Sequence, residues 1–558
     1  MRLMMMAVVW SLVAGNLPGV ADDSLIARWP LSGDGQDVSG HGLDARAHDV
    51  EFVMDAALGR TVASFDGRRS WLEVAANDRL RIGKQDFSIA ARIRIDGERD
   101  DVPGDIISRY DAATRRGFHL AIKTNAGVTF SQANAGQPQF GIDDNRAEAA
   151  WTDCGRPGNA VLAFALCSFK GDLYAGTCEP GRNESGRVYR YGGDGEWIDC
   201  GAPDRSNAVT ALAVHDGSLY AGTGKYRLRG SSLPESENDT LGGRIFRYAG
   251  GTEWVDCGRL PRAESVGGMV VYRDQLYASS LYRPAGFFRY DGGTTWTDCG
   301  CPVRPEDHPG DTSHMRVEAM GVFNGWLYAT SYDGGRVFRF DGKEWSDCGQ
   351  LGDNTQTYAF AVRQGDLYVG TWPSGRVYRF DEPDRWTDIG RLGEELEVMG
   401  MLVHNGRLIA GTLPLAEVYE YRGGMKWKKL ARLDQTPDVR YRRAWTMAEH
   451  GGRVYCSTLP SGHVHSWRAG RVAMGGSRLT PGWHHLAAVR SGSAIELYVD
   501  GELAAREEAD EIGRFDLDCG KPLKIGGGPN DRFSGCLSDV RLYGRPLSPT
   551  EVRALADE

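Results

Sequence analysis

A short tryptophan-containing phrase recurs through the middle of the chain and constrains the fold more than any other feature. Its copies read WTDCG at 151, WIDCG at 197, WVDCG at 254, WTDCG at 296, WSDCG at 345, WTDIG at 386 and, in a degenerate form, WKKLA at 427. The tryptophans are separated by 41 to 57 residues. A period of this size indicates one supersecondary unit that is used seven times.

Each unit carries two further phrases after an apolar run that ends in a polar-glycine turn. The second phrase, LYAGT or a variant, begins at Leu173, Leu219, Leu276, Leu327, Leu367, Leu408 and Val454. The third, GRVYRY or a variant, begins at Gly186, Gly243, Gly286, Gly335, Gly375, Glu417 and Gly462. Aromatic and β-branched residues dominate these phrases, which predicts four short strands in each unit and a seven-bladed β-propeller. A stack of helical repeats is the alternative, but the 3.6-residue periodicity that it requires is absent from the sequence.

The two ends of the repeat region predict that the ring closes on itself. The first phrase, at Trp151, has no strands of its own before it, and the last unit, ending near Trp467, has no convincing tryptophan phrase after it. We therefore expect the strand at Trp151 to complete the last blade, which leaves only protected sheet edges.

The flanks of the repeat region contain strand-like runs without a repeat. The first flank, 24–142, contains RWPL from Arg28, DGQDVSGHG from Asp34, ASFDG from Ala63 and DFSIAARI from Asp86; the second, 479–555, contains GWHHLAAV from Gly482, LYVDG from Leu497 and FSGCLSDVRLY from Phe533. Together these phrases resemble a laminin-G-like (concanavalin A-like) jelly roll that is cut in two. The resemblance covers roughly 200 residues and implies a fold rather than an activity.

These observations predict an all-β protein, a β-sandwich of the jelly-roll type with an inserted seven-bladed β-propeller similar to kelch or Asp-box propellers. The expected division is a signal peptide at 1–21, the first sandwich half at 22–145, the propeller at 146–474 and the second sandwich half at 475–558. Insertion is feasible because a hairpin loop and a closed ring both bring their ends close together. Two separate tandem domains would leave each flank with too few strands for a core.

The first 21 residues are typical of a secretory signal. One charge, Arg2, precedes an apolar stretch from Leu3 to Ala14, and small residues end the segment at Ala21. The stretch is too short to cross a ~30 Å hydrocarbon layer. A buried first helix is the alternative, which Asn16 and Pro18 disfavour. We expect export to the periplasm, the cell surface or the medium, and no membrane span.

The net charge of the chain limits the classes of molecule that it is expected to bind. The formal net charge is −10, which argues against nucleic acid and anionic lipid. Glycine accounts for 74 of 558 residues, well above the usual ~7%, as expected for many short strands joined by tight turns.

The chain has eleven cysteines, an odd number for an exported protein. In the laminin-G resemblance, the position of Cys536 implies a disulfide with Cys519; two buried thiols are the alternative. The repeat position of Cys154, Cys200, Cys257, Cys299 and Cys348 is occupied by Ile389 and Leu430 in the last two copies, so we interpret it as a small apolar packing position. Cys456 is interpreted in the same way. The roles of Cys167, Cys178 and Cys301 stay open.

Three aspartates in or beside glycine-rich sandwich loops, Asp34, Asp37 and Asp66, are candidate metal ligands. Laminin-G-like domains often carry calcium at the sandwich rim, so the resemblance implies Ca²⁺ as a possible cofactor. The alternative is that aspartate supports tight turns. A zinc site at His308, Asp311 and His314 is disfavoured against a solvated loop.

Four aromatic residues are candidate ligand-binding residues. Tyr226, Tyr282, Tyr332 and Trp372 fall just after the second phrase in their units, where loops should gather at one mouth of the propeller channel. Such rings suit sugar stacking or a protein contact. They can also simply cap the blades.

The leading hypothesis is an exported, non-catalytic recognition protein that binds glycan or an extracellular protein through sandwich and propeller loops. No P-loop, nucleophile elbow or HExxH helix is present in the sequence. The alternative is a glycoside hydrolase (sialidase-like) or lyase with its site at the propeller mouth, since DGGTTW from Asp291 resembles an Asp box. Pieces of such a site occur at Arg442 and Arg443 beside Tyr441, and at Arg227 and Arg229 beside Tyr226. A purely structural surface protein is the third hypothesis.

Overall fold

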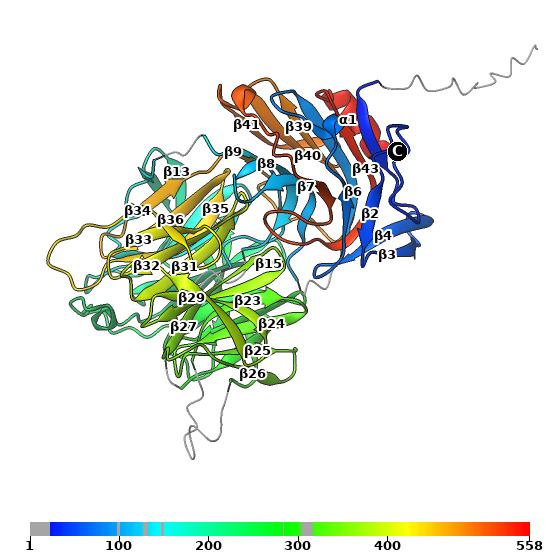
Figure 1. Ribbon diagram of the computed structural model, residues 1–558. Coiled ribbons are helices and arrows are strands. Elements are labelled where there is room, and N and C mark those ends of the chain that lie inside the picture. Colours follow the sequence, from blue (N-terminus) through cyan, green and yellow to red (C-terminus); the bar gives the residue numbers. More distant parts are fainter. Residues whose placement is uncertain (1–22, 97–100, 126–131, 147–149, 283, 303–315) are drawn as a thin grey trace, which may run out of the picture.

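The computed structural model describes residues 23–96, 101–125, 132–146, 150–282, 284–302 and 316–558. The predicted signal segment and the residues His308, Asp311 and His314 lie outside this range. The described residues form an all-β protein with a single α-helix, α1 (Pro549–Asp557), and three short 3₁₀ helices, η1 (Asp78–Leu80), η2 (Leu228–Ser231) and η3 (Ile512–Arg514). No helix among them is long and apolar enough to cross a membrane. A sandwich of blue, cyan and orange-to-red strands lies beside a teal-to-yellow propeller (Figure 1).

The sandwich contains two antiparallel sheets. The strands of the first follow the order β3-β4-β43-β6-β39-β40-β41, with β1 also paired to β43. Its strands are β1 (Leu25–Trp29), β3 (Glu51–Asp55), β4 (Arg60–Asp66), β6 (Phe87–Ile95), β39 (Gly482–Ser491), β40 (Ala494–Val499), β41 (Glu502–Glu508) and β43 (Ser534–Tyr543). The second sheet follows the order β2-β5-β42-β7-β8-β9-β38. Its strands are β2 (Ala45–His48), β5 (Trp71–Val74), β7 (Gly104–Asp111), β8 (Arg116–Lys123), β9 (Gln137–Asp144), β38 (Arg471–Met474) and β42 (Leu523–Ile525).

Strand β6 shows why the two flanks build one core. Its alternate residues from Phe87 to Ile95 are buried in the cluster shared by both sheets, because side chains of a strand alternate between faces. Its neighbours β39 and β43 both come from the second flank. Strand β38 also belongs to the sandwich, although the predicted division placed Arg471–Met474 at the end of the propeller segment.

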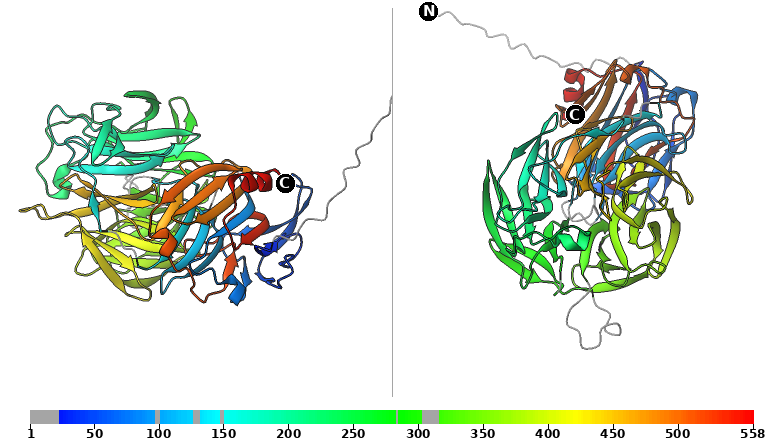
Figure 2. Two further views of the ribbon diagram at one scale, coloured as in Figure 1. Left: turned by 90° about the horizontal axis from the view of Figure 1, so that it is seen from above. Right: turned by 90° about the vertical axis from the view of Figure 1, so that its left-hand side faces the viewer.

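The propeller contains five separate four-stranded sheets and one eight-stranded sheet (Figure 2). Four of the separate sheets are consecutive meanders: β19 (Val266–Tyr272), β20 (Gln275–Ser280), β21 (Phe287–Gly292) and β22 (Thr295–Asp298); β23 (Val317–Phe323), β24 (Trp326–Ser331), β25 (Arg336–Phe340) and β26 (Trp345–Gln350); β27 (Gln356–Arg363), β28 (Asp366–Trp372), β29 (Arg376–Glu382) and β30 (Arg385–Arg391); β31 (Glu397–His404), β32 (Arg407–Leu413), β33 (Glu417–Tyr421) and β34 (Trp427–Arg432). The fifth joins β35 (Arg443–His450), β36 (Arg453–Leu459) and β37 (Val464–Trp467) to β10 (Thr152–Asp153).

The eight-stranded sheet accounts for the first two repeat units. Its strands are β11 (Leu162–Phe169), β12 (Asp172–Cys178), β13 (Val188–Gly193), β14 (Glu196–Asp199), β15 (Ala208–His215), β16 (Ser218–Gly224), β17 (Arg244–Gly250) and β18 (Glu253–Arg259). The end of β12 pairs with the start of β15 through Cys178 and Ala208, which joins two four-stranded meanders into one sheet. The predicted count of seven separate blades is therefore not supported, and five separate blades are present in the described part of the chain.

The ring closes through the strand at the start of the propeller. Thr152 pairs with Ser466, and Asp153 pairs with His465, so β10 is the fourth strand of the last blade. The ring of Trp151 stacks on that of Trp467, with centroids 5.9 Å apart. The predicted closure is confirmed by this pairing.

In five of its seven copies the tryptophan phrase connects a unit to the unit before it, whereas Nε1 of Trp151 and of Trp345 has no hydrogen-bond partner in the described ranges. The indole N–H donates to the carbonyl oxygen at the Cys position of the preceding phrase: Trp197 to Cys154, Trp254 to Cys200 and Trp296 to Cys257 at 2.8 Å, Trp386 to Cys348 at 2.7 Å, and Trp427 to Ile389 at 3.1 Å. The Asp of the phrase accepts from the N–H of the Gly two residues on, as between Asp199 and Gly201 at 2.8 Å. The repeated residues therefore act between and within units, and none of these contacts needs a ligand.

Loss of one indole donor should destabilise the ring measurably. Trp254→Phe keeps an aromatic ring but leaves the carbonyl of Cys200 without this donor, so we expect the free energy of unfolding to fall by about 1–2 kcal/mol. Urea denaturation measures the difference. Trp326→Phe is the matched control, because the Trp326 ring stacks under Arg339 and makes no contact of this kind. Equal losses in the two variants would contradict the assigned role.

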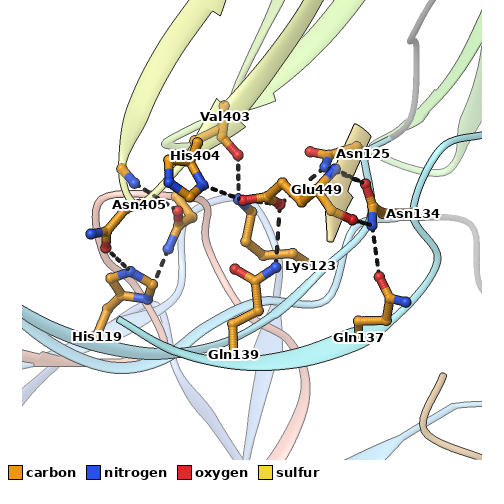
Figure 3. A network of polar contacts seen from close by, with 12 residues as sticks. His119, Lys123, Asn125, Asn134, Gln137, Gln139, Val403, His404, Asn405 and Glu449 are labelled. Carbon is orange, nitrogen blue, oxygen red and sulfur yellow. Dashed lines mark hydrogen bonds and ion pairs between the residues drawn. The ribbon is translucent and has the colours of Figure 1, made fainter. Parts of the chain in front are cut away.

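A buried polar cluster joins the sandwich to the propeller (Figure 3). The Lys123 ammonium of β8 lies 2.9 Å from Oε2 of Glu449 in β35, and Nδ1 of His404 donates to Oε1 of Glu449 at 2.8 Å. Asn125 and Gln139 also donate to Oε2 of this carboxylate. All five side chains are buried, so the cluster fixes the two bodies against each other in one specific arrangement.

Removing the charge of Glu449 should destabilise the whole chain. Burial raises the pKa of this carboxyl, but Lys123 and His404 outweigh that effect and bring the pKa to about 2. Its stabilising contribution is thus present above the ordinary pKa of 4.5 and is lost as the pH falls toward 2. Glu449→Gln leaves the Lys123 charge buried without a carboxylate, so we expect a loss of about 3 kcal/mol at pH 7 in urea denaturation.

A double variant provides the control for this junction. Lys123→Met combined with Glu449→Gln should lose less stability than the sum of the two single variants, because no unpaired charge remains. A Glu449→Gln protein as stable as the unaltered chain would contradict the argument.

Candidate functional site

A cavity of about 630 Å³ lies at one mouth of the propeller. Its walls come from the starts of the first strands of neighbouring units and from the loops that follow the second strands. Glu318 of β23, Tyr358 of β27, Met399 of β31 and Trp445 of β35 belong to the first group. These first strands are neighbours around the ring, so their ends converge.

Three of the four predicted aromatic residues line this cavity. Tyr226, Tyr282 and Tyr332 follow β16, β20 and β24 and belong to its wall. The hydroxyl of Tyr226 lies 2.7 Å from that of Ser231 in η2. Trp372 is not part of the wall. It packs edge-on against Tyr441, with ring centroids 6.3 Å apart.

Two arginines cover tyrosine rings at the rim. The guanidinium of Arg227 lies 4.4 Å from the centroid of Tyr282, and that of Arg316 lies 4.1 Å from the centroid of Tyr332. Arg316 is also paired with Asp333 at 2.9 Å, and Arg227 is paired with Glu264. These cation–π contacts hold the rings in place and leave both arginines electrically compensated.

Two buried carboxyl groups occur at the starts of the first strands, Glu318 in the cavity wall and Glu397 at the start of β31. Burial raises the pKa of Glu318 to about 8, and the neighbouring Glu397 and Asp333 add to the shift although Arg316 opposes it. Burial also raises the pKa of Glu397 to about 7, against the opposing charge of Arg443 and a hydrogen bond from Tyr358. At neutral pH the Glu318 carboxyl of the cavity wall therefore keeps a proton that an ordinary glutamate would have released.

Glu318, Tyr358 and Glu397 were not predicted from the sequence. The strand register shows that they occupy equivalent first-strand positions whose residue type varies between units. The third residue of each LYAGT phrase pairs with a residue of the first strand of the same unit. Counting two residues back along the first strand from that paired residue gives one equivalent position in every unit. Across the units these residues are Phe164, Thr210, Gly267, Glu318, Tyr358, Met399 and Trp445. The position two earlier is occupied by Leu162, Ala208, Ser265, Arg316, Gln356, Glu397 and Arg443. Both rows vary while the framework repeats, which marks them as positions that the fold does not dictate.

The predicted calcium ligands are occupied by backbone groups. Asp37 accepts from the N–H groups of Arg28 and Leu43 at 3.0 Å. Oδ1 of Asp66 accepts from the N–H of Arg68 and from the Ser70 hydroxyl, and these turn contacts lower its pKa to about 2 against the effect of burial. Oδ1 of Asp34 accepts from the Gln36 N–H at 3.0 Å. The described residues contain no group of three or more His, Cys, Asp or Glu placed to hold a metal ion, and calcium binding stays a prediction.

The predicted disulfide between Cys519 and Cys536 is not formed. Cys536 lies in β43 of the first sheet, where Arg94 donates to its sulfur at 3.1 Å. Cys519 follows Asp518, whose carboxylate is paired with Arg109 of the second sheet. Cys536 is thus a strand residue of the first sheet, whereas Cys519 lies in the loop between η3 and β42.

The repeated cysteines are packing residues in the structure. Cys154, Cys200, Cys257 and Cys348 are buried and Cys299 is half-buried. No disulfide is present between cysteines of the described ranges. The packing interpretation is supported by the clusters in which these side chains lie.

Comparison with known proteins supports the fold of one flank. A family model for the concanavalin A-like lectin/glucanases superfamily matches residues 437–553. That segment is similar to the superfamily. It spans the second sandwich half together with the strands β35 to β37 of the last blade.

Several solved structures align with this chain at low scores. A virginiamycin B lyase from Staphylococcus aureus is 8% identical, with a TM-score of 0.43, over 57% of this chain and 98% of that one. YCF48 bound to D1 peptide is 11% identical, with a TM-score of 0.40, over 57% and 97%. The extracellular domain of the putative one component system BT4673 from B. thetaiotaomicron is 11% identical, with a TM-score of 0.39, over 62% and 52%. Likenesses of this size carry no argument about function.

The raised pKa of Glu318 predicts that the free energy of unfolding falls as the pH rises from about 4.5 to about 8. Because the carboxyl stays protonated in the folded chain up to about pH 8 but ionises near 4.5 when unfolded, stability should fall by up to about 1.4 kcal/mol per pH unit between these values. Glu318→Gln removes this dependence. We expect the variant to match the unaltered protein near pH 5 and to have the higher Tm at pH 8.

Thermal unfolding at pH 5, 7 and 8.5 tests this expectation. Glu253→Gln is the matched control, because Glu253 is exposed on β18. At each pH this variant should have the same Tm as the unaltered protein. A Glu318→Gln protein whose Tm difference does not grow with pH would contradict the assignment.

Proposed function

We propose that the protein is an exported recognition protein that binds a carbohydrate in the cavity at the propeller mouth. The observation that carries the proposal is the cavity itself, in which tyrosine rings from several units surround buried polar groups. Its volume of about 630 Å³ falls within the roughly 300–1,000 Å³ of small-molecule sites and suits a mono- or disaccharide unit.

The chemistry of the wall favours a sugar over an apolar ligand. Tyr282 and Tyr332 each have one ring face covered by an arginine, which leaves the other face for packing against the C–H face of a sugar, and Glu318 offers a hydrogen-bond acceptor at the same cavity. An apolar ligand would leave such buried polar groups unsatisfied at a cost of about 1–3 kcal/mol each.

Two further features support the same role. The match of residues 437–553 to a superfamily that includes lectins supports a binding role for the sandwich. The apolar N-terminal segment ending at Ala21 supports export. Binding to an extracellular protein through the sandwich loops is compatible with the cavity site, since the two surfaces are distinct.

A glycoside hydrolase or lyase is the second candidate. The buried carboxyl of Glu318 in the cavity wall favours it, because glycosidases need one carboxyl group that keeps its proton near neutral pH. Turnover of a reporter glycoside that Glu318→Gln abolishes would establish this candidate over simple binding.

Binding is tested with a glycan array followed by calorimetry on the best neutral sugar. Tyr332→Ala removes a ring from the cavity wall, and we expect it to weaken binding at least tenfold. Trp326→Ala is the control, because Trp326 lies at the opposite end of β24 and outside the wall. Absence of any sugar ligand, or equal effects of the two substitutions, would contradict the proposal.

A further inference from the structure

Two side chains at the cavity are buried with hydrogen-bonding atoms that have no partner in the described part of the chain. Nε and Nη1 of Arg443 have no acceptor, and Oε2 of Glu318 has no donor. Arg443 is 8% exposed and Glu318 is 3% exposed. A charged donor and a carboxyl acceptor that lose water without gaining a partner are costly, so each marks a place where a ligand atom completes the contact.

Both groups belong to the two variable rows of the first strands. Arg443 is the first residue of β35, and Trp445 two residues later lies on the same face of that strand. Glu318 follows the start of β23. Both side chains are part of the cavity wall, so one ligand can reach both.

Arg443 is fixed in position by aromatic rings. Its guanidinium lies 5.5 Å from the centroid of Tyr441 and 5.7 Å from that of Trp445. Such contacts orient the group without using its N–H donors. The donors therefore stay available to a ligand.

The charges around Arg443 leave room for a further anion. Arg316 and Arg227 at the rim are already paired with Asp333 and Glu264. The acidic group that acts on Arg443 is Glu397, which burial keeps protonated more readily than an ordinary glutamate. Arg229, the fourth arginine of the wall, is exposed, so Arg443 is the buried guanidinium of this wall for which the described ranges supply no ion pair.

We propose that the sugar bound here carries a carboxylate that pairs with Arg443 and a hydroxyl that donates to Glu318, which makes it a uronic acid unit. The inference rests on the proposed carbohydrate binding and specifies its ligand. A guanidinium matches the planar geometry of a carboxylate. Sugar hydroxyls supply the donor that Glu318 lacks, and the tyrosine rings accept the ring face.

The experiment compares pairs of methyl glycosides that differ only at C6. Calorimetry measures the affinity for glucuronide against glucoside and for galacturonide against galactoside. We expect the acidic member of one pair to bind at least tenfold more tightly. Arg443→Gln should remove this preference, so that the acidic and the neutral member of each pair bind with equal affinity.

Further variants keep the test decisive. Arg443→Lys retains the charge and should keep part of the preference, and circular dichroism of each variant verifies folding. Glu318→Leu removes the acceptor and should weaken both members of a pair to a similar degree, since each donates a hydroxyl to this group. The matched control Arg442→Gln changes an arginine whose Nε donates to the Thr436 carbonyl, and should leave the preference intact.

The outcomes separate the two proposals. If neutral and acidic sugars bind equally, or if the 6-sulfated glucoside binds more tightly than the glucuronide, the carboxylate assignment is overturned while carbohydrate binding stands. If no sugar in the panel or the array binds, both proposals are overturned. A preference that survives in Arg443→Gln would also overturn the assignment.

Discussion

The hydrogen bond from a tryptophan indole to the carbonyl of the preceding unit is the contact on which the rest of the propeller depends. It recurs at 2.7–2.8 Å between four pairs of units, and at 3.1 Å in the degenerate seventh copy. The glycine of the phrase is fixed by the same junction. Gly201 has φ +90°, and a Cβ there would lie 2.5 Å from the Thr252 carbonyl oxygen of the next unit. The phrase repeats because each copy must fit its neighbour.

The outer strands and the tryptophan hydrogen bonds hold the ring together. The residues at the starts of the first strands are therefore not constrained by contacts between units. The residues in the row of Glu318 range from Gly267 to Trp445, whereas the residue after each is Ala, Gly or Thr, as at Ala319 and Gly400. The first-strand residues of the cavity wall come from the units from Arg316 onward. The loop after β16 supplies the other side of the wall with Tyr226 and Arg227.

The fold was largely predictable from the sequence because its signals are local: the repeated phrases report strand positions, and the incomplete first and last units report closure. The separation of blades was not predictable, since the backbone pairing of Cys178 with Ala208 leaves no motif. Of the site, Tyr226 could be found from its place after a repeated phrase. Glu318 could not, because the units must be aligned by register. Aligning the shared NAV of the first two units sets Leu162 opposite Thr210, whereas the ladder sets Phe164 there.

The buried carboxyl groups at the junction and at the cavity have opposite pKa shifts and opposite effects on stability. At the junction, Glu449 is surrounded by donors, its pKa is lowered to about 2, and the ionised group stabilises the arrangement of the two bodies. At the cavity, Glu318 has an oxygen without a partner in the described ranges, its pKa is raised to about 8, and it opposes folding as the pH rises. A group retained at such a cost within a framework that needs no polar residue there is best explained by a ligand. The contrast between two equally buried carboxyls is thus the strongest physical reason to place the function at the propeller mouth.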